Sequence, residues 1–251
     1  MGNALIALSA LALALATPQT RTIGAAEGGL RQMALSSVMP SYPASSLAAG
    51  TSGVAVAAIL TSTTAGGAPT VEILEAPDPA IADAVRAALA KWTFAVFQYP
   101  MQGKLTFYFR IEQGKGRVVN PQDLPGGPVV RPRPTYTPEN PPPVASSSVS
   151  SNVFVLKEEN TTPITFEELQ KLTGANRPTI LDVGERSAFK RGHLDGAVNI
   201  PYDEVAVRAP IELRGVARIV IDCTREENRA CLSADHSLKL GGFKDVAILR
   251  R

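Results

Sequence analysis

The chain of 251 residues has few of the side chains that build metal centres and disulfide frameworks. It contains two cysteines and two histidines. Two cysteines are too few for a disulfide framework, and two histidines without a Cys/His cluster argue against a zinc or histidine-rich metal site. An excess of one charge is also missing, because 25 basic and 23 acidic residues are interspersed and leave a net charge of +2. The composition therefore gives no indication of a nucleic-acid partner.

Long apolar runs are equally scarce. The one such run covers residues 4–16 and consists of Ala, Leu, Ile and one Ser. A helix needs roughly 20 apolar residues to cross a bilayer, so this run is too short for a transmembrane span and has the length of a signal-peptide core. Ala14 and Ala16 are small enough for a cleavage site. We expect residues 1–16 to be a signal peptide that exports the protein; an uncleaved membrane anchor or a disordered tail are the alternatives.

Composition divides the rest of the chain into two domains and a linker. Residues 17–37 are small, polar and Gly-rich, which predicts a flexible lead-in. Residues 121–152 are rich in proline and end in a Ser-rich run. The proline part favours an extended polyproline II spacer that holds the domains apart, and the serine part favours flexibility. A PxxP recognition site is the alternative. The two domains are then residues 38–120 and 153–251.

The first domain has the pattern of a small α+β fold. Residues 53–60 and 70–74 predict a pair of antiparallel strands. Asp78 is placed to cap a helix whose first residue is Pro79, and apolar residues recur at helical spacing up to Trp92. Residues 104–111 alternate strictly between apolar and polar side chains, which predicts a half-buried antiparallel strand. We expect an antiparallel sheet covered by one helix, with Trp92 in its core.

This domain resembles the TonB C-terminal domain family. The matching motifs are Pro40-Ser-Tyr-Pro43, Gly53-Val-Ala-Val56 and Lys91-Trp-Thr-Phe94. Domains of that family lie in the periplasm and bind other envelope proteins, often by adding a peptide strand to a sheet edge. The resemblance implies a periplasmic protein with an envelope partner. Since the sequence lacks a transmembrane helix before the domain, we expect a borrowed binding module and not an energy transducer.

The second domain alternates between strands and helices. Residues 153–156, 178–183, 219–221 and 244–249 predict strands. A capping box at Thr165 and Glu168 opens one helix, and residues 229–240 predict another that ends at Gly241-Gly242. Such alternation predicts a parallel α/β sheet with right-handed crossovers.

Cys223 directly follows the apolar residues 219–221 of the predicted buried strand. The carboxyl end of such a strand is where open α/β sheets place their sites. Backbone N–H groups of a loop that enters a helix can converge on a thiolate and lower the pKa of the thiol from about 8.5. Cys223 is therefore a candidate nucleophile, and the alternative is a small apolar side chain at a strand end.

The second domain also resembles the rhodanese-like domain, the family of single-cysteine sulfurtransferases. The resemblance rests on Ile180-Leu-Asp-Val183, Gly192-His-Leu-Asp-Gly-Ala-Val-Asn-Ile-Pro201 and Val220-Ile-Asp-Cys223. It implies that Cys223 carries sulfane sulfur as a persulfide from a small donor to a thiol acceptor, without a metal or organic cofactor. It also implies that Arg229 holds an anionic donor such as thiosulfate, while His193 and Asp182 order the loops. The remaining loop residues implied to bind the donor are Thr224, Arg225, Glu226, Glu227 and Asn228.

The loop departs from the family pattern in ways that keep two alternatives open. Arg229 follows Cys223 by six residues where the family usually has five, and six is the offset of rhodanese-fold phosphatases and arsenate reductases. Glu226 and Glu227 would oppose a dianion if they pointed inward. The alternatives are a non-catalytic envelope scaffold with an inactive rhodanese-like domain, and an oxyanion enzyme. Cys231 is interpreted as a buried core cysteine, with a resolving or disulfide-forming thiol as the other possibility.

Overall fold

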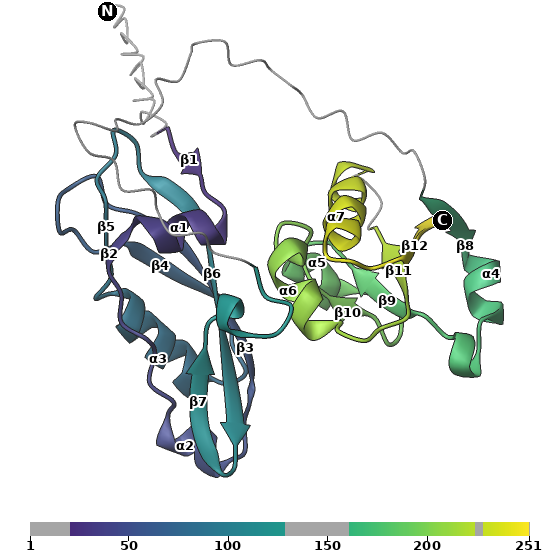
Figure 1. The fold of residues 1–251 in the computed structure, drawn as a ribbon, viewed down its shortest axis with the longest axis horizontal. Helices are drawn as coiled ribbons and strands as arrows, with labels where there is room; N and C mark the ends of the chain where they lie inside the picture. Colours follow the sequence, from purple (N-terminus) through teal and green to yellow (C-terminus); the bar gives the residue numbers. More distant parts are fainter. Residues whose placement is uncertain (1–20, 129–160, 224–227, 251) are drawn as a thin grey trace, which may run out of the picture.

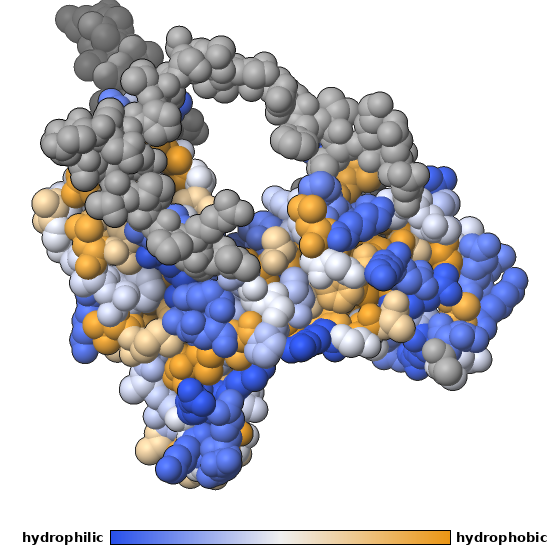
Figure 2. Space-filling model, in the orientation of Figure 1, coloured by the Kyte–Doolittle hydropathy of each residue, from blue (hydrophilic) through white to orange (hydrophobic). Residues whose placement is uncertain are grey.

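A computed structural model describes residues 21–128, 161–223 and 228–250. These residues form two domains that lie side by side (Figure 1), one built from residues 21–124 and the other from residues 161–250. The predicted signal peptide, most of the predicted linker and the predicted strand at 153–156 lie outside the described residues. In the described part of the chain no helix is long and apolar enough to cross a membrane. The visible face of both domains mixes hydrophilic residues with small hydrophobic patches (Figure 2).

The N-terminal domain is built on a five-stranded sheet. Its long central strands β3 and β6 pair antiparallel over their whole common length, and β4 pairs antiparallel with β3. The spatial order is β1-β6-β3-β4, and β7 pairs with the other end of β6. The predicted antiparallel pairing is confirmed for β3, β4 and β6, but β1 pairs parallel with β6, so the whole sheet is mixed. The strands are β1 (Ile23–Gly24), β3 (Gly53–Leu60), β4 (Thr70–Glu75), β6 (Met101–Glu112) and β7 (Lys115–Val119).

Helix α3 (Pro79–Leu89) covers one face of this sheet as expected. The side chain of Asp78 accepts a hydrogen bond from the Ile81 N–H at 2.7 Å, so the predicted cap is present. The apolar stripe of α3 is buried over β3 and β4, in one core with the aromatic side chains of β6. Trp92 lies in the same core and donates its indole N–H to the Val38 carbonyl at 2.8 Å. A second short helix, α2 (Ala44–Ala48), precedes β3.

The expected flexible lead-in is wrong for residues 21–36. They form β1, helix α1 (Glu27–Met33) and strand β2 (Ala34–Ser36), and β2 pairs with β5 (Thr93–Phe94). Leu30 is fully buried, and α1 lies across β6 in Figure 1. The Thr106 N–H donates to the Glu27 carboxylate at 3.0 Å, which fixes the helix to that strand. Leu30 and the buried Glu27 carboxylate hold the helix of this segment together with the pairing of β1 and β2, and none of these contacts produces a sequence period.

The first residues of the predicted linker also belong to this domain. Residues Pro121–Asp123 form the 3-10 helix η1, and Leu124 is buried just after it. Pro121 occupies the first position of η1, where a missing N–H costs nothing. The proline at 121 therefore ends a folded domain. Residues 129–152 of the predicted linker lie outside the described residues.

The C-terminal domain contains a fully parallel five-stranded sheet, as predicted. Its order is β10-β9-β11-β12-β8. The strands are β8 (Thr162–Thr165), β9 (Thr179–Asp182), β10 (Val198–Asn199), β11 (Arg218–Asp222) and β12 (Asp245–Arg250). The helices are α4 (Phe166–Lys171), the 3-10 helix η2 (Gly174–Asn176), α5 (Arg186–Arg191), α6 (Val205–Glu212) and α7 (Asn228–Leu240).

Both faces of this sheet are covered by apolar side chains. Ile219 and Ile221 of β11 pack on one side with residues of α6 and α7, while Val220 between them packs on the other side with Leu169 of α4. Burial on both faces explains why β11 is continuously apolar instead of alternating. The predicted capping box of α4 is present, and the left-handed Gly242 follows α7 as expected. This framework places Cys223 at the carboxyl edge of the sheet.

Candidate functional site

Cys223 directly follows β11 and is half-buried against the core on the α6–α7 side of the sheet. The residue before it, Asp222, is buried and lies in register with Asp182 at the end of the neighbouring strand β9. The sulfur is therefore held at the position where parallel α/β sheets present reactive groups. The predicted location of the candidate nucleophile agrees with the structure.

Cys223 forms a disulfide with Cys231. Their Cα atoms are 5.9 Å apart, within the range that a disulfide bridges. Cys231 lies in the first turn of α7 and is only 2% exposed. The expected burial of Cys231 is confirmed, but the preferred interpretation as an unpaired core cysteine is wrong. Because α7 starts so soon after β11, the start of the helix folds back over the strand end and brings both sulfurs together.

The other predicted donor-binding residues are only partly within the described residues. Arg229 lies in the first turn of α7 and is exposed. Asn228 is the first residue of α7. Thr224, Arg225, Glu226 and Glu227 lie outside the described residues, so the direction of the two glutamates stays a prediction. The disulfide nevertheless fixes the two ends of this loop, because Cys223 precedes it and Cys231 follows Arg229 by two residues.

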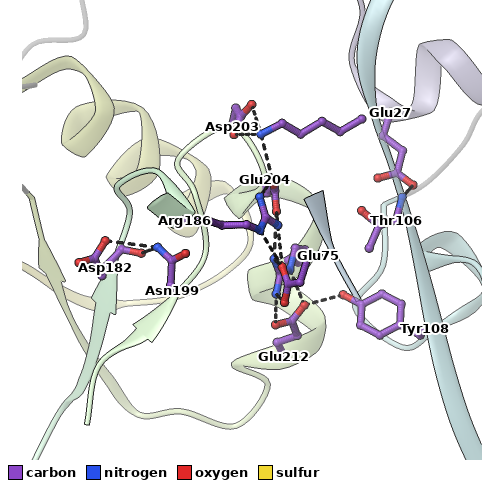
Figure 3. A network of polar contacts seen from close by, with 12 residues as sticks. Glu27, Glu75, Thr106, Tyr108, Asp182, Arg186, Asn199, Asp203, Glu204 and Glu212 are labelled. Carbon is purple, nitrogen blue, oxygen red and sulfur yellow. Dashed lines mark hydrogen bonds and ion pairs between the residues drawn. The ribbon is translucent and has the colours of Figure 1, made fainter. Parts of the chain in front are cut away.

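A second loop at the same edge is ordered by Asp182. This residue is fully buried, and its carboxylate accepts a hydrogen bond from the Gly184 N–H at 2.9 Å. The amide of Asn199 donates to the carbonyls of Asp182 and Gly184, at 3.1 and 2.9 Å. Figure 3 shows the Asp182 and Asn199 side chains facing one another. The loop-ordering role expected for Asp182 is confirmed.

His193 also has the structural role that the resemblance implies. Its Nδ1 lies 2.9 Å from the Phe189 carbonyl oxygen at the end of α5, and its ring stacks on the Phe189 ring at 3.8 Å between centroids. Both contacts are with the helix that directly precedes it.

A buried network of charged groups lies between the two domains and was not predicted from the sequence. Its centre is formed by Glu204 at the start of α6, Arg208 within α6 and Arg186 at the start of α5. The side chains of Glu204 and Arg208 are each 3% exposed. Arg208 contacts Glu204 at 2.9 Å and Glu212 at 2.7 Å, while Arg186 pairs with Glu204 from the other side. These residues belong to the C-terminal domain, and Figure 3 shows Arg186 and Glu204 next to Glu75 of the N-terminal domain.

Three residues of the N-terminal domain complete the network. Glu75, the last residue of β4, contacts Arg186 at 2.7 Å and Arg208 at 2.8 Å. Lys104 of β6 contacts Asp203 at 2.7 Å and Glu204 at 2.9 Å. Tyr108, also on β6, donates its hydroxyl to Glu212 at 3.0 Å. The expectation that the linker holds the domains apart is therefore wrong, since charged groups of both domains are in direct contact.

The charged network shifts the pKa values of its side chains. Burial alone would raise the pKa of Glu204, but the hydrogen bonds and charges of Arg186 and Lys104 outweigh burial and lower it from 4.5 to about 2. Burial lowers the pKa of Arg208, yet its contacts with Glu212, Glu75 and Glu204 raise it overall. Burial and the adjacent Glu212 carboxylate raise the pKa of Tyr108. These groups therefore keep their charges, and Tyr108 its proton, near neutral pH.

One signal for this network was available in the sequence. Glu204, Arg208 and Glu212 recur every four residues, so they lie on one face of a helix and can pair along it. The partners Glu75, Lys104 and Tyr108 carry no comparable signal, because nothing in a strand sequence identifies a contact with another domain. Next to the network, a cavity of about 710 Å³ opens between the domains, with Glu75, Tyr108 and Asn199 among its lining residues.

The family model of the rhodanese-like domain matches residues 165–251. This segment begins at the cap of α4, contains the carboxyl edge with Cys223, and ends after β12. The C-terminal part of the chain is therefore a rhodanese-like domain. No group of three or more potential metal-ligating side chains occurs among the residues that the structure describes.

No curated protein matches the chain. Among solved structures, EanB and its hercynine-bound variants are 22% identical, with a TM-score of 0.31 over 37% of this chain and 24% of that chain. Reduced Bacillus anthracis CoADR-RHD is 15% identical, with a TM-score of 0.29 over 78% of this chain and 33% of that chain. An NAD-dependent persulfide reductase from A. fulgidus is 16% identical, with a TM-score of 0.27 over 84% of this chain and 35% of that chain. This chain thus spans between 24% and 35% of the length of these solved chains.

Proposed function

We propose that the C-terminal domain transfers sulfane sulfur through a persulfide on Cys223. The observation that carries the proposal is the position of Cys223 at the carboxyl edge of a parallel sheet in a rhodanese-like domain. In the first step the Cys223 thiolate attacks the outer sulfur of a donor such as thiosulfate. The S–S bond of the donor breaks, sulfite leaves with the bonding electron pair, and Cys223 becomes a persulfide. A thiol acceptor then takes the outer sulfur and restores the thiolate.

Arg229 supports the handling of an anionic donor. It is exposed in the first turn of α7, where its guanidinium can reach an anion in solvent and the helix N-terminus favours negative charge. Residues Thr224 to Asn228 would add backbone N–H groups around the leaving sulfite. This arrangement requires no metal or organic cofactor.

The disulfide defines the state in which this chemistry can occur. The nucleophile is a thiolate, and a cysteine in a disulfide is not one, so the form with the Cys223–Cys231 bond is the resting, oxidised form. A thiol reductant must open the bond before sulfur is loaded. Activity should therefore depend on prior reduction.

The proposal extends to location and partner. The apolar run at residues 4–16 supports export to the periplasm, and a disulfide is compatible with an oxidising compartment. For the N-terminal domain we propose a TonB C-terminal-like module that binds an envelope protein. Strand β4 ends the order of its sheet, and such an edge can accept an added peptide strand.

Two observations favour a non-catalytic scaffold as a second candidate. The disulfide occupies the candidate nucleophile, and the charged network joins the two domains through several buried contacts. A scaffold would need this rigidity and would not need a free thiol. The two candidates differ in whether the reduced protein turns over a sulfur donor.

The deciding experiment measures thiocyanate formation from thiosulfate and cyanide by the reduced full-length chain. We expect turnover by the wild type and none by Cys223→Ser. Cys231→Ser is the matched control, because it removes the same disulfide but keeps the nucleophile, and it should retain activity. Equal inactivity of all three proteins, with their folds intact by circular dichroism, would favour the scaffold. Cys223-dependent hydrolysis of an aryl phosphate would instead favour the oxyanion enzyme.

A further inference from the structure

The sulfur of Cys231 is enclosed in the core and is accessible to the sulfur of Cys223 alone. It lies in the first turn of α7 and is 2% exposed, on the same helix face as the fully buried Ala234 and Leu238. All three pack into the core on the α6–α7 side of the sheet, where Cys223 packs at the edge. An external donor or acceptor therefore has no access to the Cys231 sulfur, whereas Cys223 is bonded to it directly. A structural core cysteine would not need this neighbour.

We propose that Cys231 is a resolving thiol, which converts the Cys223 persulfide into the disulfide and releases sulfide. The inference rests on the proposed persulfide chemistry of Cys223. The Cys231 thiolate attacks the inner sulfur of the persulfide, which is Cys223 Sγ. The bond between Cys223 Sγ and the outer sulfur breaks, and the outer sulfur leaves as hydrosulfide with the bonding electrons. The sulfane sulfur is reduced to sulfide while the two cysteines are oxidised to the disulfide.

The full cycle needs one external reductant, a dithiol. Thiosulfate and the dithiol enter; sulfite, sulfide and the oxidised dithiol leave, so that sulfur, hydrogen and electrons balance. The dithiol acts by attacking the Cys223–Cys231 bond. Its point of attack is Cys223, because Cys223 is half-buried and Cys231 is enclosed. The disulfide in the structure is then the product state of the sulfide-releasing step.

Two features favour this internal step over transfer to an outside thiol. The Cα atoms of the two cysteines are already 5.9 Å apart, so the attack needs no large movement of the backbone. Intramolecular reactions between groups held in this way proceed as if the partner were present at a very high concentration. In addition, Cys223 is half-buried against the core, so an outside thiol has only limited access to it, whereas Cys231 is already bonded to it.

The test is a single-turnover experiment on the full-length chain. The protein is reduced, freed of reductant without air, and mixed with thiosulfate; free sulfide and the intact mass are then followed together. The wild type should release sulfide in proportion to the protein and lose the mass of two hydrogen atoms as the disulfide forms. Cys231→Ser should instead gain and keep the mass of one sulfur atom, with the rate of sulfide release lowered at least about tenfold.

Two further variants control for effects of a substitution in α7 other than the loss of the Cys231 thiol. Ala230→Ser is the matched control, because it changes a neighbouring buried position of α7 but keeps both thiols, and it should behave as the wild type. Cys231→Ala replaces Cys231→Ser if the buried serine hydroxyl prevents folding. The inference is overturned if the wild type holds its persulfide as long as the Cys231 variants do. If no protein gains a sulfur atom, including Cys231→Ser, the proposed persulfide chemistry itself fails and the resolving role fails with it.

Discussion

Two regions of this molecule, the disulfide at the sheet edge and the charged network between the domains, link parts of the chain in different ways. At the sheet edge, Cys223 and Cys231 are eight residues apart and are joined by one covalent bond. At the domain interface, Glu75 contacts Arg186 and Arg208 across 111 and 133 residues through several noncovalent contacts. The first region responds to reductants and the second to pH and to loss of any charged partner. The disulfide is thus a local covalent link at the candidate site, whereas the charged network is a long-range noncovalent contact between the domains.

The two regions also differ in how they stabilise the fold. A disulfide over a short loop mainly restricts the unfolded chain and contributes roughly 2–3 kcal/mol. A buried ion pair contributes little net energy while it is intact, because desolvation offsets the attraction. Removing one partner, however, leaves an uncompensated buried charge and costs about 3–5 kcal/mol. Breaking the interface should therefore cost more than opening the disulfide.

The largest effect is expected from Arg208→Ala. The substitution leaves the buried Glu204 without one of its cations and removes contacts with Glu75 and Glu212. Because Glu204 keeps its contacts with Arg186 and Lys104, we expect the free energy of unfolding in urea to fall by about 3 kcal/mol, the lower end for a broken buried pair. The matched control is Arg86→Ala, which breaks an exposed pair with Asp83 and should cost less than about 1 kcal/mol. Similar losses for both variants would show that the interface contributes no more than a surface ion pair.

The next effect concerns the disulfide. Reduction of the wild type should lower its free energy of unfolding by roughly 2–3 kcal/mol, because the loop between the two cysteines is released in the unfolded chain. Urea unfolding with and without a thiol reductant measures this difference. The double variant Cys223→Ser/Cys231→Ser is the control and should not respond to the reductant. A wild type that is equally insensitive would mean that the disulfide does not stabilise the protein.

Features that depend on neighbouring residues were predicted from the sequence. Strands β3, β4, β6, β9, β11 and β12, the Asp78 cap, the Thr165 capping box and the position of Cys223 all depend on residues close together in the chain, and each was predicted. Such features follow from local periodicity and hydrogen bonding. The pairing of the two cysteines could be predicted only in part. Their separation in the sequence permits a disulfide, but whether one forms depends on how α7 lies relative to the end of β11.

The missed features depend on contacts between distant segments. Helix α1 is held by Leu30 and by the hydrogen bond from Thr106 to Glu27, and residues 27–33 have no strong helical period. The interface likewise requires Glu75 to meet Arg208, which no local pattern of charge can indicate. Tertiary contacts determine whether these elements form, and such contacts cannot be identified from a single sequence.

A smaller effect is expected from titrating the network. The folded-state pKa of Glu204 is about 2 against 4.5 ordinarily, so its contribution to stability is present above 4.5 and is lost as the pH falls from about 4.5 toward about 2. Wild type and Glu204→Gln are compared by thermal unfolding across this range. Other carboxylates titrate in both proteins, so Glu204 is isolated by the difference between the curves, which should shrink toward acid. A constant difference would contradict the lowered pKa.

The smallest effect on stability is expected at the edge of the charged network. Tyr108→Phe removes the hydroxyl that donates to Glu212, while Glu212 keeps its contact with Arg208. Because the acceptor stays paired, we expect a loss of about 1 kcal/mol, well below that of Arg208→Ala. Urea unfolding measures it, with Tyr202→Phe at an exposed tyrosine as the control. A loss as large as that of Arg208→Ala would mean that the domains depend on every contact equally, and the distinction between the buried centre and its edge would not hold.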